Sequence, residues 1–135
     1  MYSVTREISF CYGHRLLQYD GKCRHLHGHN GRAVITLASA DLDALGMVMD
    51  FTLLKRVVGG WIDGQLDHKM LLHKDDPALA YLQSQSEPIF VMDVNPTAEN
   101  IARLIFDFAA SQGFPVTEVK LWETDSSCAT YARSS

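Results

Sequence analysis

The chain has 135 residues and is 47% hydrophobic, which is enough for one domain over residues 1–135 with a substantial core. Its net charge of −4 argues against a nucleic-acid-binding protein, and it lacks an apolar stretch long enough for a membrane span. Three cysteines, an odd number, argue against a secreted disulfide-stapled domain. The polar N-terminus lacks the apolar core of a signal peptide, so we expect a cytoplasmic protein.

The first half of the chain predicts two strands followed by a helix. Residues 2–12 alternate in polarity as a strand does, residues 13–29 form a connection rich in glycine and histidine, and residues 30–40 predict a second strand. A helix follows, because apolar residues recur with a period of about 3.6 residues between positions 53 and 66.

The second half predicts a second long helix and two closing strands. Residues 89–93 are typical of a short strand, Thr97 is a good N-cap for the helix, and Gly113 ends it. Two strands follow at roughly 116–124 and 128–133. Sequential strands with short connections favour antiparallel pairing. We therefore expect an α+β fold whose four main strands form an antiparallel sheet with two long helices on one face; the segment 89–93 is not counted among the four.

Three histidines continue rows of side chains that are predicted to face the interior. His27 and His29 form an H-x-H pair, and residues i and i+2 of a strand point to the same side. His14 ends the apolar row of the first strand. Such residues can be ordinary hydrogen-bonded core histidines, but a buried imidazole needs a partner. Zinc held by three histidines keeps an open fourth position, which is typical of catalytic sites, so we predict Zn²⁺ at these residues.

Other residues could add chemistry to this site. Cys23 lies four residues before His27, and it could be a fourth zinc ligand or a thiolate base beside the metal. Asp67 and His68 could form a proton relay, although ordinary chemistry at a helix end is the better explanation of this pair taken alone.

Glu123 is a carboxylate on a predicted strand face that it shares with Val119 and Leu121. A buried carboxylate needs hydrogen-bond donors or a cation. The partner could be a ligand with adjacent N–H donors, such as the edge of a guanidine-like heterocycle, or it could be a lysine or arginine in a salt bridge.

Several short motifs follow one another in a fixed order: F-C-Y-G-H-R-L at 10–16, C-R-H-L-H-G-H-N at 23–30, G-M-V-M-D-F at 46–51, L-D-H-K at 66–69, N-P-T-A-E-N at 95–100 and W-E-T at 122–124. Together they resemble the 6-pyruvoyl-tetrahydropterin synthase / 6-carboxy-tetrahydropterin synthase family. The resemblance implies a tunnelling fold, in which subunits join their sheets into a barrel with active sites at subunit interfaces. It implies a homo-oligomer, a trimer or a dimer of trimers, without a nucleic-acid or membrane partner. It also assigns roles to particular residues: zinc ligands His14, His27 and His29, the catalytic thiol Cys23, the relay pair Asp67 and His68, and the pterin anchor Glu123.

The resemblance also implies a substrate, 7,8-dihydroneopterin triphosphate, with zinc as a Lewis acid and the Cys23 thiolate as the base. We predict formation of 6-carboxy-5,6,7,8-tetrahydropterin, the queuosine precursor. The alternatives are 6-pyruvoyl-tetrahydropterin synthase, which stops after triphosphate elimination, and a non-catalytic pterin- or metal-binding module. Cys23 argues against an aldolase branch that has a carboxylate instead of the thiol. Two positions depart from many relatives: Gly31 replaces an aromatic residue, and Met70-Leu71-Leu72 replaces a Leu-Asn step.

Overall fold

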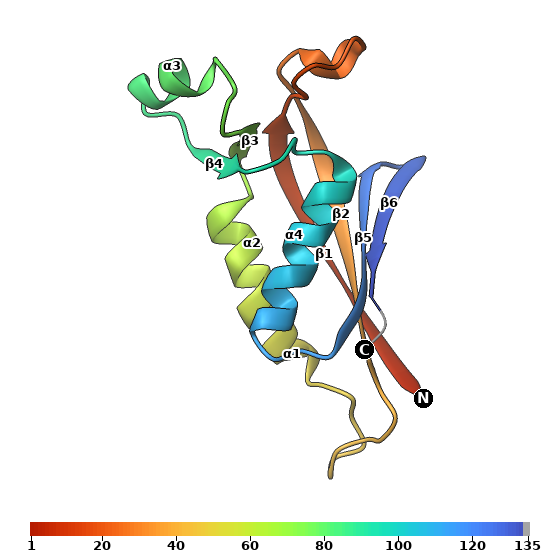
Figure 1. Ribbon diagram of the computed structural model, residues 1–135. Coiled ribbons are helices and arrows are strands. Elements are labelled where there is room, and N and C mark those ends of the chain that lie inside the picture. The colour runs from red at the N-terminus through yellow and green to blue at the C-terminus, as the bar shows by residue number, and fades with distance from the viewer. Residues whose placement is uncertain (134–135) are drawn as a thin grey trace.

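The computed structural model describes residues 1–133 and has two layers, a long twisted sheet and helices that cover one of its faces (Figure 1). The sheet has six strands in the order β4-β3-β1-β2-β5-β6. Their bounds are β1 (Tyr2–His14), β2 (His27–Ser39), β3 (Lys69–His73), β4 (Ile89–Met92), β5 (Val116–Thr124) and β6 (Ser127–Ala132). The α+β class is confirmed, but the prediction of four strands is wrong.

The four predicted strands are β1, β2, β5 and β6, and they pair antiparallel as expected. The two additional strands, β3 and β4, are parallel to β1 and to each other. The five residues of β3 carry no clear alternation, and this strand pairs with β1 only over Tyr12–His14. Its strand conformation therefore depends on a distant partner, which a local pattern does not reveal.

The strands around the histidines are longer than the sequence predicted. β1 continues to His14 and β2 begins at His27, so the connection between them is shorter than the expected 13–29. A short 3₁₀ helix, η1 (Lys22–Arg24), lies within this connection. As a result, all three histidines lie on strands, where the two-residue side-chain period applies.

The helical layer consists of two long helical segments and one short helix. The first segment runs through α1 (Phe51–Leu54), the π-helical η2 (Lys55–Gly59) and α2 (Gly60–Gln65), and the Asp50 carboxylate caps its start by accepting from the Thr52 N–H at 2.8 Å. The second is α4 (Ala98–Ser111), whose N-cap is Thr97 as predicted. The short helix α3 (Leu79–Ser84) lies apart from both (Figure 1). No helix among residues 1–133 is long and apolar enough to cross a membrane.

The hydrophobic core lies between the sheet and the two long helical segments. The inward rows of β1 and β2 supply Phe10, Tyr12, Ala33, Ile35 and Leu37, all of which are buried. Because His14 continues the β1 row and is itself 1% exposed, the histidine cluster sits at the end of the core and not on an open surface.

Candidate active site

The three predicted metal ligands lie together at one end of the sheet. In the β1–β2 register, His14 is opposite His27 and Tyr12 is opposite His29. The ring centroid of His14 lies 4.4 Å from that of His27 and 5.1 Å from that of His29. The centroids of His27 and His29 are 4.9 Å apart. Adjacent strands with the same inward phase therefore bring the imidazoles into contact.

Backbone carbonyls fix the orientation of two of these rings. The Nδ1 atom of His14 lies 2.6 Å from the Pro96 carbonyl oxygen, and the Nδ1 atom of His27 lies 2.7 Å from the His25 carbonyl oxygen. A carbonyl oxygen can only accept, so each Nδ1 carries the proton and each Nε2 keeps a free lone pair. This is the arrangement by which metal-binding histidines are usually oriented.

The Nε2 atoms of all three histidines are buried and have no hydrogen-bond partner among residues 1–133. Burial, together with the neighbouring imidazoles, holds the pKa of His29 below its ordinary value, although Glu123 acts in the opposite direction. Unpaired buried nitrogens are unfavourable, and neutral imidazoles are good ligands for zinc. These residues therefore fit a Zn²⁺ ion.

Glu123 reaches the same cluster from β5. Its Oε1 atom lies 2.7 Å from His29 Nε2 and 3.3 Å from His14 Nε2, without the alignment of a hydrogen bond. The contact with His14, more than any other, keeps the pKa of Glu123 low in spite of partial burial. One ligand atom from each of His14, His27, His29 and Glu123 lies within 4.8 Å of the others. The ion pairs of Glu123 are thus with histidines and not with a lysine or arginine.

Cys23 lies beside this cluster. It is half-buried on η1 and lines a cavity of about 550 Å³ together with His14, Glu123 and residues at the start of α4. The group of converging metal-ligand atoms does not include its thiol. A small molecule in this cavity would therefore contact the thiol, the carboxylate and the metal-binding region at once.

Asp67 and His68 form the predicted pair but lie elsewhere. The Asp67 carboxylate accepts from His68 Nδ1 at 2.7 Å and from the Cys11 N–H at 2.8 Å, and the Cys11 hydrogen bond is the main reason that the pKa of Asp67 is lowered. Cys11 points to the face of β1 opposite that of Tyr12 and His14. The His68 side chain is 77% exposed, and this residue does not line the Cys23 cavity. Within one chain, the relay and the thiol are therefore apart.

Sequence reasoning missed several residues that hold the site in place. Pro96 and His25 act through backbone carbonyls, which leave no signal in side-chain chemistry. The side chain of Asn95 accepts from the Leu17 N–H and donates to the Leu17 carbonyl, at 3.0 and 3.1 Å, which ties the cavity wall to the start of α4. The N-P-T-A-E-N motif drew attention to this segment but not to these contacts.

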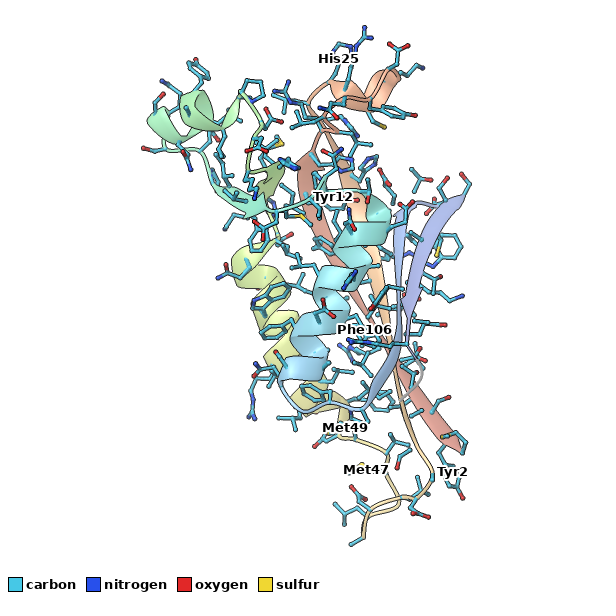
Figure 2. All side chains as sticks on the ribbon, in the orientation of Figure 1. Tyr2, Tyr12, His25, Met47, Met49 and Phe106 are labelled. Atoms are coloured by element: carbon cyan, nitrogen blue, oxygen red, sulfur yellow. The ribbon has the colours of Figure 1, made fainter. Side chains whose placement is uncertain are left out.

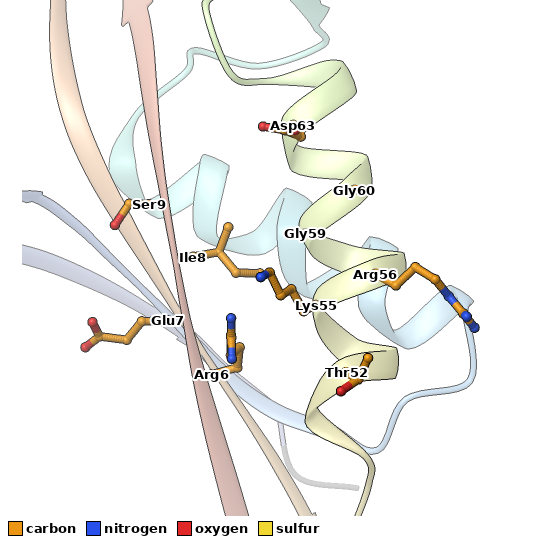
Figure 3. Close-up of a pocket in the computed structure, with 10 residues that line it drawn as sticks. All are labelled: Arg6, Glu7, Ile8, Ser9, Thr52, Lys55, Arg56, Gly59, Gly60 and Asp63. Atoms are coloured by element: carbon orange, nitrogen blue, oxygen red, sulfur yellow. The ribbon is translucent and has the colours of Figure 1, made fainter.

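A larger cavity, of about 640 Å³, lies between β1 and the first helical segment, away from the histidines (Figure 3). It is lined by Arg6, Lys55 and Arg56 together with Glu7, Asp63 and smaller residues. It contains none of the predicted site residues, and its size alone does not make it the active site.

Comparisons with known sequences point to one family. The profile of the family described as 6-pyruvoyl tetrahydropterin synthase matches residues 3–134. A Rickettsia bellii protein named 6-carboxy-5,6,7,8-tetrahydropterin synthase is 40% identical over 131 residues, covering 92% of this chain and 95% of its own. A Haemophilus influenzae protein with the same name is 32% identical, covering 97% of this chain and 99% of its own.

Solved structures give the same result for the fold. An uncharacterised protein from Wolinella succinogenes superposes with a TM-score of 0.82 at 28% identity and covers 98% of each chain. A Caenorhabditis elegans 6-pyruvoyl tetrahydropterin synthase gives a TM-score of 0.71 at 25% identity, covering 98% of this chain and 96% of its own. The family predicted from the motifs is thus confirmed, and the chain belongs to the 6-pyruvoyl tetrahydropterin synthase family.

Proposed function

We propose that the chain is a zinc-dependent lyase that converts 7,8-dihydroneopterin triphosphate to 6-carboxy-5,6,7,8-tetrahydropterin. The observation that carries this proposal is the set of three buried Nε2 atoms without hydrogen-bond partners, next to a cavity that contains a thiol and a carboxylate. Relatives at 32–40% identity bear the name of this enzyme. A cytoplasmic location and a pterin substrate remain predictions.

His14, His27 and His29 would hold the zinc ion, which when bound supplies Lewis-acid polarisation of a ligand oxygen. Cys23, in the same cavity but outside the ligand group, would accept the C–H proton at its sulfur. A thiol close to a cation ionises more readily, which favours this role as a base.

Glu123 would orient the substrate ring. A carboxylate accepts two adjacent N–H donors at once, and the edge of a pterin presents such a pair. Because Glu123 and His14 line one cavity, a ring anchored at Glu123 would have its side chain close to the metal-binding histidines.

His68 would act in the site of a neighbouring copy. Its Nδ1 atom is bound to Asp67, so Nε2 is the atom left for proton transfer, and this ring faces outward. A proton relay must come within hydrogen-bond reach of the reacting atoms, and the exposed His68 reaches no cavity that contains Cys23 in its own chain.

The sheet has a free edge that a neighbouring copy could pair with. β1 pairs with β2 along its whole length, but its other edge pairs with β3 only over Tyr12–His14 among the described residues. The cavity of Figure 3 runs along this free edge, and exposed strand edges are usually covered. β6 is an outer strand of the sheet, so its far edge is the counterpart that a second copy can offer. We infer that β6 of a second copy pairs with β1 here, giving a trimer or a dimer of trimers. Light scattering during an activity assay tests this, and a fully active monomer would contradict it.

Mass spectrometry of the products from 7,8-dihydroneopterin triphosphate tests the reaction itself. We expect 6-carboxy-5,6,7,8-tetrahydropterin from the zinc-loaded protein. A 6-pyruvoyl product would instead show that the chain is a 6-pyruvoyl-tetrahydropterin synthase. A Pongo abelii relative that is 35% identical is named 6-pyruvoyl tetrahydrobiopterin synthase. Pterin binding without turnover would make the chain a non-catalytic module.

A further inference from the structure

Tyr12 is a buried phenol next to the histidine cluster. The residue, which is labelled in Figure 2, is 1% exposed. Its ring centroid lies 5.2 Å from that of Phe10 and 5.3 Å from that of His14. The hydroxyl oxygen is buried and makes no hydrogen bond to the described residues. An unpaired buried hydroxyl is unfavourable, so the functional state is expected to provide an acceptor.

Gly31 makes room for this ring. A Cβ atom at position 31 would lie 2.9 Å from Tyr12 Cε1 and 3.5 Å from Tyr12 Cδ1, and it would also be 3.5 Å from Leu121 Cδ1. The first distance is shorter than van der Waals contact allows. The Tyr12 ring therefore occupies the space above Gly31, and it extends from β1 across β2 toward β5.

Tyr12 and Glu123 are both neighbours of His29. On the inner face, Ala33 of β2 is paired with Leu121 of β5, and the next pair is Arg32 with Trp122. The printed pairs end there, and Gly31 and Glu123 are the next residues of their strands. The Tyr12 ring centroid lies 5.7 Å from that of His29, and His29 Nε2 lies 2.7 Å from Glu123 Oε1, so the phenol and the carboxylate lie beside the same imidazole.

We propose that Tyr12 is a positioning residue for Glu123. The carboxylate is now turned toward His29 and His14, at 2.7 and 3.3 Å from their Nε2 atoms. Once a metal ion occupies those nitrogens, the carboxylate turns away from them and accepts a hydrogen bond from the Tyr12 hydroxyl. This inference rests on the proposed function, and it deepens the role of Glu123 as the residue that recognises the substrate.

The chemistry of the two groups suits this exchange. A protonated phenol donates one hydrogen bond, and a carboxylate has room for about four acceptor contacts. Glu123 can therefore bind Tyr12 and still offer acceptor positions to a pair of ligand N–H groups. Hydrogen bonds to a carboxylate are also stronger than those between neutral groups, so Tyr12 would fix the orientation in which the Glu123 carboxylate binds the ligand.

Tyr12→Phe removes only the hydroxyl group, and zinc affinity measured by competition with a chromophoric chelator gives the readout. We expect roughly tenfold weaker zinc binding, the factor that one charge-assisted hydrogen bond implies. We also expect an unchanged or higher melting temperature for the metal-free protein, because the hydroxyl has no partner there. Tyr131→Phe, on β6 against Phe106, is the matched control and should leave zinc affinity unchanged.

A double-mutant cycle with Glu123→Ala isolates the contact. In the Glu123→Ala background, Tyr12→Phe should have no further effect on zinc affinity. Gly31→Ala, which crowds the ring but keeps the hydroxyl, should weaken zinc binding as Tyr12→Phe does. The inference is overturned if Tyr12→Phe binds zinc normally, if its effect persists without Glu123, or if it lowers the melting temperature equally with and without zinc. A wild-type protein that does not bind zinc would overturn the proposed function, and this inference with it.

Discussion

Replacing Glu123 with glutamine separates its proposed role in ligand recognition from a structural role. The substitution keeps the shape of the side chain, removes its charge, and exchanges one acceptor oxygen for an NH₂ donor. That donor would face the N–H groups of a pterin edge. The loss of one charge-assisted hydrogen bond and the new donor–donor contact should weaken pterin binding by about 2–4 kcal/mol, roughly 30- to 1,000-fold.

The effect on folding should be much smaller. The contacts of Glu123 with His14 and His29 lack hydrogen-bond alignment, so replacing the carboxylate with an amide of the same shape breaks no hydrogen bond to these two rings. We expect the zinc stoichiometry to stay at about one ion per chain, which is what a three-histidine site takes.

Titration calorimetry with neopterin, together with metal analysis and a melting curve, distinguishes the two roles. Glu118→Gln is the matched control, because it makes the same chemical change on the same strand away from the histidines. A lowered melting temperature with near-normal neopterin affinity would refute the reasoning and make Glu123 a structural ion-pair partner.

Other substitutions test the remaining parts of the site. His29→Ala should lose most bound zinc in metal analysis, and wild-type zinc content in this variant would contradict a three-histidine site. Cys23→Ala should abolish turnover but keep zinc and the melting temperature, whereas loss of zinc would indicate that the thiol is a ligand. Asp76→Asn should destabilise the fold by about 3 kcal/mol in urea denaturation, because it removes the buried carboxylate that pairs with the half-buried Arg15. The exposed Asp75→Asn should have little effect. The hydrogen bond from Arg15 lowers the pKa of Asp76, so the stabilisation is complete above the ordinary aspartate pKa and is lost as the pH falls below it. A difference in unfolding free energy between wild type and Asp76→Asn that stays constant through this pH range would contradict this reasoning.

The convergence of the histidines could be predicted because it depends on a local property of strands. Side chains two residues apart face the same side, and β1 and β2 are neighbours in sequence that pair antiparallel as expected. The motif order predicted the family, which the comparisons confirm. The identity of the metal and the catalytic roles stay predictions.

The contacts that complete the site come from distant segments and could not be predicted. The approach of Glu123 depends on the β2–β5 register, and the orientation of His14 depends on the Pro96 carbonyl, 82 residues away in sequence. The separation of His68 from Cys23 follows from β3, the short strand that the local pattern did not reveal. Each of these three features depends on contacts between distant segments, which residue type and spacing in the sequence do not reveal.

The hydrogen bond from His14 to the Pro96 carbonyl couples the proposed metal site to the docking of α4 on the sheet. Pro96 immediately precedes the N-cap of α4, so His14 is held in the ligand tautomer only after that helix has docked on the sheet. A newly made chain would acquire its ion late, after both ends of the sequence have met. Conversely, an ion bound to His14 would stabilise the His14–Pro96 hydrogen bond and make local unfolding at the start of α4 less frequent. Amide exchange in the first turn of α4 would therefore slow when the ion is bound, although this turn does not contact the ion.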